Sequence, residues 1–172
     1  MGASCGAGWR PSGQGRQDHG RCHGPLPVNV DRVGEVSADL EVSDGTEPEW
    51  LTVEDVEDAH ARQLRIFGGA VGIRDRGTLE SAVGRPINRW RYEQAELAEL
   101  AAAYAFGVVR NHPFMDGNKR AGFMAMMGFL LLNDTPFEPD PAEATAIILG
   151  LAAGEIDESG LTRWIRDNWP KT

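Results

Sequence analysis

Nine consecutive residues from His112 to Arg120 combine side-chain types that bind phosphate groups and transfer protons. They read His-Pro-Phe-Met-Asp-Gly-Asn-Lys-Arg and lie between two segments whose hydrophobic patterns predict long helices. Gly117 and Asn118 fall at the expected start of the second helix, where free backbone N–H groups and the positive end of the helix dipole attract an anion. The run therefore predicts a phosphate-binding loop.

The charged and aromatic side chains of this run indicate what the loop could do. Lys119 and Arg120 fall in the first helical turn, where positive charge is unfavourable unless a polyphosphate is bound. Asp116 is suited to hold Mg²⁺, which takes only one or two protein carboxylates and fills its other positions with phosphate oxygens and water. His112 is suited to accept a proton from an attacking hydroxyl, and Phe114 to anchor the loop in the core. Together they predict phosphoryl or nucleotidyl transfer.

Each of these residues also has a common structural use when it is considered alone. A histidine before a proline is usually a surface loop residue, Asp116-Gly117 would form a turn, and Asn118 would cap a helix. The charges of Lys119 and Arg120 could simply be solvated. Their concentration in one short loop between core helices is what favours a catalytic interpretation.

The elements that must position the loop are predicted to be helices. An amphipathic period marks Glu96 to Arg110, whereas Asn118 to Leu132 is apolar on nearly every face and is expected at the centre of a bundle. A further helix is predicted from Thr52, an N-cap with the acidic Asp55 three positions on, to Phe67. Others are predicted near residues 79–84, over 142–153, where Gly154 ends the helix, and over 157–169. Strand patterns are absent, so the predicted fold class is all-α, a bundle of roughly six helices.

The stretch from Arg85 to Tyr92 has no helical period and mixes aromatic residues with arginines. Arg85 precedes Pro86, which disfavours helical geometry at Arg85, so the second helix is expected to end at Gly84. We expect an exposed loop or short hairpin, a flap near residues 86–92. Its few basic residues lie on an acidic domain, which favours peptide binding over nucleic-acid binding.

Composition limits the remaining possibilities. The chain has 172 residues, 26 of them acidic and 17 basic, so it fits one domain and direct nucleic-acid binding is not expected. Residues 1–45 are rich in Gly, Ser, Pro and Arg and predict a disordered N-terminal extension, leaving 46–172 as the folded domain. The only cysteines are Cys5 and Cys22, and no apolar run reaches the ~20 residues that span a bilayer. We expect a cytoplasmic protein that does not enter a membrane.

The run from His112 to Arg120 resembles the signature of the Fic/Doc family, His-x-Phe-x-Asp/Glu-Gly/Ala-Asn-x-Arg. The similarity extends from Trp50 to Trp169 and includes the segment Arg74-Asp75-x-Gly77-x-Leu79-Glu80-Ser81-Ala82. It implies a helical Fic fold with His112 as the general base and Asp116 as the metal-linked carboxylate. The implied phosphate cradle consists of Gly117, Asn118, Lys119 and Arg120, with Arg120 also counted among the catalytic residues.

Two positions resemble the Doc, or death-on-curing, branch of this family. AMP-transferring members usually have a glycine and a second arginine where this chain has Lys119 and Phe123. The Doc branch implies a reversed ATP, bound with Mg²⁺, whose γ-phosphate passes to a serine or threonine of a target protein. Gly117 fits the AMP-transferring pattern, so a protein adenylyltransferase remains an alternative, and a non-catalytic binding module is a third.

The same resemblance implies partners of a type II toxin–antitoxin system. The expected target is elongation factor Tu, whose phosphorylation would halt translation, and the expected target-docking residues are Arg85, Pro86, Ile87 and Asn88 in the flap. A cognate antitoxin is expected to place its disordered C-terminal segment, folded as a helix, in an apolar groove. The inhibitory pattern Ser/Thr-x-x-x-Glu-Gly/Asn does not occur in the sequence, so inhibition within the chain is not expected.

Overall fold

The computed structural model describes residues 46–170 of the chain, and these residues form six α-helices. The helices are α1 (Val53–Phe67), α2 (Arg76–Glu93), α3 (Leu97–Asn111), α4 (Asn118–Leu132), α5 (Pro141–Ala153) and α6 (Glu158–Asp167). Residues 46–170 contain no strand beyond an isolated antiparallel bridge between Ile73 and Phe114. The predicted all-α class is confirmed, and the expected extension, residues 1–45, lies outside the described residues. Within residues 46–170, no helix combines the length and apolarity needed to cross a membrane.

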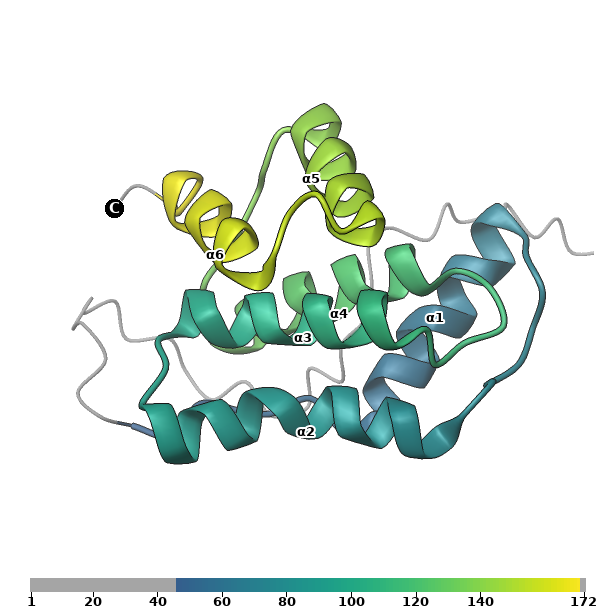
Figure 1. The fold of residues 1–172 in the computed structure, drawn as a ribbon, viewed down its shortest axis with the longest axis horizontal. Coiled ribbons are helices and arrows are strands. Elements are labelled where there is room, and N and C mark those ends of the chain that lie inside the picture. Colours follow the sequence, from purple (N-terminus) through teal and green to yellow (C-terminus); the bar gives the residue numbers. More distant parts are fainter. Residues whose placement is uncertain (1–45, 171–172) are drawn as a thin grey trace, which may run out of the picture. The chain divides into compact units, whose positions relative to one another are not determined.

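Helix α3 is the central element of the described domain. It packs against α2, α4, α5 and α6, and Figure 1 shows it between α2 on one side and α5 and α6 on the other. Its small residues let neighbouring helices approach closely, and Leu100, Tyr104 and Val108 are fully buried among them. Helix α4, which the sequence placed at the centre, is less enclosed: Leu131 is half exposed. The alanines of α3 explain why α3 takes the central position instead of α4, because close contact on every side requires small side chains.

Glycines mark the closest helix contacts. A Cβ atom added to Gly107 of α3 would lie 3.1 Å from the backbone of Ala82 in α2. A Cβ atom added to Gly122 of α4 would lie 2.6 Å from Cγ2 of Val109 and 3.0 Å from the carbonyl oxygen of Ala105. The helices that flank the candidate loop are therefore held at a separation that only glycine permits.

Replacing Gly122 with alanine should lower the free energy of unfolding by about 1–3 kcal/mol, because the added methyl group meets a stiff valine and a backbone carbonyl. Chemical denaturation of the purified protein measures this change. Gly84 in α2 is the matched control, since nothing lies within 4 Å of an added Cβ there. Gly84→Ala should raise stability by up to about 1 kcal/mol through helix propensity alone. Equal stability of the two variants would contradict this account of the α3–α4 contact.

The predicted flap is wrong, because α2 continues through residues 86–92 to Glu93. Pro86 has no N–H to donate within the helix, which ordinarily costs about 3 kcal/mol. Tertiary contacts offset that cost. Pro86 itself is buried, Arg85 and Arg89 both pair with Glu158 of α6, and Trp90 packs edge-on against Trp50 at 6.5 Å. Sequence rules for proline count only the local penalty, so they ended the helix at Gly84 instead of Glu93.

The start of α1 is formed as the sequence predicts. Thr52 and Asp55 make a capping box, in which the Asp55 backbone N–H donates to the Thr52 hydroxyl and Asp55 accepts from the Thr52 backbone. The preceding residue, Leu51, is tied to the core because its N–H donates to the Tyr104 hydroxyl at 3.1 Å. Burial raises the pKa of Tyr104, so this hydroxyl stays protonated. The Leu51 bond ties the residues before α1 to α3, whereas α1 itself packs against α4.

Candidate active site

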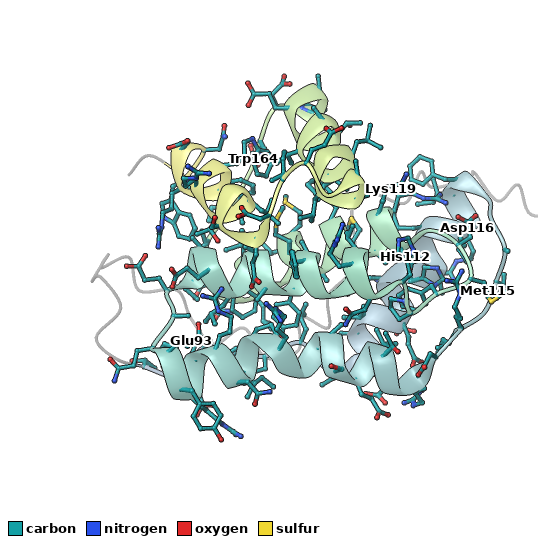
Figure 2. The ribbon with its side chains drawn as sticks, in the orientation of Figure 1. Glu93, His112, Met115, Asp116, Lys119 and Trp164 are labelled. Carbon is teal, nitrogen blue, oxygen red and sulfur yellow. The ribbon has the colours of Figure 1, made fainter. Side chains whose placement is uncertain are left out.

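His112 ends α3 in the left-handed region, with φ 50° and ψ 52°. Glycine is the usual residue at such a position, and another residue there costs about 1 kcal/mol. Pro113 follows and cannot continue the helix, so α3 ends here. The histidine side chain is exposed to solvent, whereas Pro113 and Phe114 are buried. Figure 2 shows His112, Asp116 and Lys119 at the same end of the domain, where α3 gives way to α4.

The side chain of Asn118 closes the loop between α3 and α4. Its Oδ1 accepts from the N–H of Phe114 at 2.8 Å, and its Nδ2 donates to the carbonyl oxygen of Phe114 at 2.9 Å. Asn118 is only 6% exposed and Phe114 is fully buried. The Asn118 amide is thus occupied by the loop itself. Asn118 can contribute to the expected phosphate cradle only through its backbone N–H.

The connection between α1 and α2 lies directly against this loop, and sequence reasoning missed the contact. The N–H groups of Arg74 and Asp75 donate to the carbonyl oxygen of Pro113 at 2.6 and 3.2 Å, and the N–H of Met115 donates to Gly72 at 3.0 Å. Figure 1 shows the connection curving past the end of α3. Three glycines within five residues, at positions 68, 69 and 72, were the available signal, because they allow close backbone approach.

Asp116 is exposed, and its two carboxylate oxygens have different surroundings. Oδ1 accepts from the N–H of Gly117 at 2.6 Å. Oδ2 faces Gly69, where an added Cβ would lie only 2.5 Å away, so the glycine makes room for the carboxylate. The described residues contain no group of three or more His, Cys, Asp or Glu side chains placed to hold a metal ion. A cation here would need phosphate and water for most of its coordination.

The start of α4 has backbone donors without an acceptor in the part of the chain that the structure describes. Within residues 46–170, the N–H groups of Asn118, Lys119 and Arg120 have no acceptor, as expected for a first helical turn. Gly117 precedes them with φ 75°, a conformation that favours glycine. The Lys119 side chain is exposed, whereas Arg120 donates to the carbonyl oxygen of Gly68 at 3.2 Å. This terminus has the donors and the charge to bind an anion.

An apolar cavity of about 580 Å³ opens beside these residues, between α4 and α5. Lys119 and Arg120 lie at its edge, and Phe123, Met127 and Leu149 contribute to its wall. Phe123 is the residue that stands in place of a second arginine. The cavity therefore joins a charged rim to an apolar interior, which is the combination expected for a ligand with phosphate groups and a planar ring.

The four residues expected to dock a target lie elsewhere, on α2. Arg85 pairs with Glu158 and stands over the Phe106 ring at 5.1 Å, and Pro86 is buried. Arg85 and Asn88 line a polar pocket of about 300 Å³ that extends to Asn111, the residue before His112. Their expected docking role stays a prediction. The structure adds a second candidate, the segment 68–75, which contacts the loop directly.

The chain is similar to known proteins over the segment that contains the loop between α3 and α4. A family model described as "Fic/DOC family" matches residues 50–130, which include the whole loop. The chain is 31% identical over 117 residues to "Protein kinase doc" of Escherichia phage P1, an alignment that covers 67% of this chain and 92% of the relative. It is 37% identical over 94 residues to "Toxin Doc" of Mycolicibacterium smegmatis, covering 54% of this chain and 70% of the relative.

Proposed function

This chain belongs to the Fic/DOC family, and we propose that it is a Doc-type toxin that transfers the γ-phosphate of ATP to a serine or threonine of a protein. The observation that carries the proposal is the exposed His112 beside a helix terminus whose three free N–H groups can bind phosphate. The name of the phage relative, which refers to a protein kinase, supports phosphate transfer over AMP transfer.

The surroundings of the cradle support the same choice. Lys119 is exposed at the rim and occupies space that a glycine would leave for further phosphates. Phe123 lines the apolar cavity, so a second arginine contact is missing where AMP-transferring members have one. A site with one basic cluster and an adjacent apolar wall suits a nucleotide whose terminal phosphate alone enters the cradle.

In the proposed reaction His112 accepts the proton of the target hydroxyl, whose oxygen then bonds to the γ-phosphorus while the bond to the β–γ bridging oxygen breaks and ADP leaves. The free N–H groups of α4 stabilise the phosphate oxygens. Asp116 has an exposed carboxylate and belongs to no group of three or more metal-binding side chains within residues 46–170, which fits Mg²⁺ that is bound together with a nucleotide. The ion, when bound, neutralises charge on the phosphates.

We propose that the target is elongation factor Tu and that its acceptor segment docks along residues 68–75. These residues bond to the loop through their backbone and expose Val71 at 85%, and the neighbouring Met115 is 53% exposed. An extended peptide laid beside them would bring its hydroxyl towards His112. A translation factor as target also places the protein in the cytoplasm.

We further propose a cognate antitoxin, as expected for a Doc-type toxin. The apolar cavity between α4 and α5 and the half-exposed Leu149 at its edge offer a surface that an amphipathic helix can cover. An antitoxin segment seated there would block the cavity and the charged rim together. Co-expression with the product of the adjacent gene, followed by purification of a complex, tests this partner.

The proposed function is tested by offering the protein elongation factor Tu, Mg²⁺ and ATP labelled at either phosphorus. We expect γ-label on the factor and none from α-labelled ATP. Transfer of α-label would establish AMP transfer instead, which Gly117 in the motif would allow. Absence of both labels, with toxicity in cells unchanged in His112→Ala, would leave the binding-module alternative.

A further inference from the structure

We infer that His60 is a positioning residue for the transfer reaction, an inference that rests on the proposed function. His60 lies on α1, is only 5% exposed, and its Nε2 is 2.8 Å from the carbonyl oxygen of Asp116. A carbonyl oxygen only accepts, so the proton of this bond belongs to Nε2. The bond joins α1 to the loop at the residue that is proposed to hold Mg²⁺.

The direction of one peptide group links His60 to the carboxylate. The carbonyl of Asp116 and the N–H of Gly117 belong to the same planar unit, so a bond that fixes one also fixes the other. The Gly117 N–H in turn donates to Oδ1 of Asp116 at 2.6 Å. His60 therefore sets the orientation of the peptide group, and that group sets the position of the Asp116 carboxylate.

His60 also contacts the residues on either side of this peptide group. Its ring stacks on Phe114, with centroids 3.8 Å apart and planes 12° from parallel. A Cβ added to Gly117 would lie 3.3 Å from Nε2 of His60, so the ring limits movement of the glycine. The imidazole thus holds the loop at residues 114, 116 and 117.

A buried histidine that merely fills the core is the alternative interpretation. The buried face of α1 contains Val56 and Leu64, one turn to either side of His60, and both are apolar. If position 60 only had to fill the core, a third apolar residue there would be sufficient. The donor at that position bonds to the loop backbone, which is what a positioning role requires and packing does not.

Two variants of equal length separate the donor from the packing: His60→Gln keeps an N–H that can reach the carbonyl, and His60→Met does not. We expect kcat in His60→Met to fall about 10–100-fold, as for other groups that orient a metal-binding side chain, with KM for the target protein unchanged. His60→Gln should retain most of the wild-type kcat. His60→Phe, which preserves the ring stack, should be impaired like His60→Met.

A second readout does not depend on activity. Hydrogen exchange of the Gly117 amide, followed by NMR, should be faster in His60→Met and His60→Phe than in the wild-type protein and His60→Gln. Because this exchange is measurable even if the wild-type protein transfers no phosphate, failure of the proposed function is distinguishable from failure of this inference. Wild-type exchange and kcat in His60→Phe, or equal impairment of the Gln and Met variants, would overturn it.

Discussion

Replacing His112 with alanine is expected to lower the rate of phosphate transfer about 10²–10⁴-fold, the usual contribution of a positioned general base. The side chain is exposed and makes no hydrogen bond within residues 46–170, so its removal should leave the fold and nucleotide binding intact. The measurement is single-turnover transfer from labelled ATP to the target protein. Nucleotide affinity and the melting temperature are determined on the same sample.

Arg110→Ala is the matched control for this variant, because Arg110 is also exposed near the end of α3 and lies outside the pocket that Arg85 and Asn88 line. Its transfer rate should remain within a few-fold of wild type. Transfer by His112→Ala at the control's rate would rule out His112 as the base and move the proton acceptor elsewhere. Loss of nucleotide binding in His112→Ala would instead mean that the imidazole contacts the phosphates.

Asp116→Asn is expected to reduce transfer by about a hundredfold or more and to raise the Mg²⁺ concentration needed for half-maximal rate. This substitution isolates the charge, since the asparagine Oδ1 can still accept from the N–H of Gly117 and preserve the turn. The test is a magnesium titration of the transfer rate at saturating ATP. Loop geometry is checked by the amide spectrum of residues 113–118.

Asp58→Asn controls for the loss of one negative charge, because Asp58 is an exposed residue on α1 outside the loop. Its magnesium dependence should match that of the wild-type protein. If Asp116→Asn also titrates like the wild type, the carboxylate does not bind the ion, and its role would be confined to the hydrogen bond within the turn.

The sequence predicted those helices whose signals are local. The period between residues 96 and 110 and the apolar run from 118 to 132 correspond to α3 and α4 almost residue for residue. The capping box at Thr52 and the glycine after α5 likewise marked the start of α1 and the end of α5. Helix α2 was cut short because its continuation past Pro86 depends on Glu158, a residue that is distant in the sequence.

The candidate site likewise has a part with local sequence signals and a part that depends on residues distant in the sequence. The loop residues are contiguous, so their chemistry could be interpreted from the sequence alone. The groups that hold the loop come from α1 and the 68–75 segment, and His60 bonds to Asp116 across 56 residues. Asn118 illustrates the remaining limit: the sequence placed this residue in the phosphate cradle, and the structure shows that its side chain binds the backbone of Phe114. No pattern in the sequence indicates where such a side chain points.

The distance along the chain between the loop and its supports has a consequence for folding. Contacts between residues far apart in sequence form only after the entropy of closing a long loop has been offset, which generally happens late. The hairpin of α3 and α4 contains every residue of the motif, yet it lacks the backbone partners in 68–75. A nascent chain that has formed only this hairpin would therefore be inert, and harmful activity would arise only with cooperative folding of the whole domain.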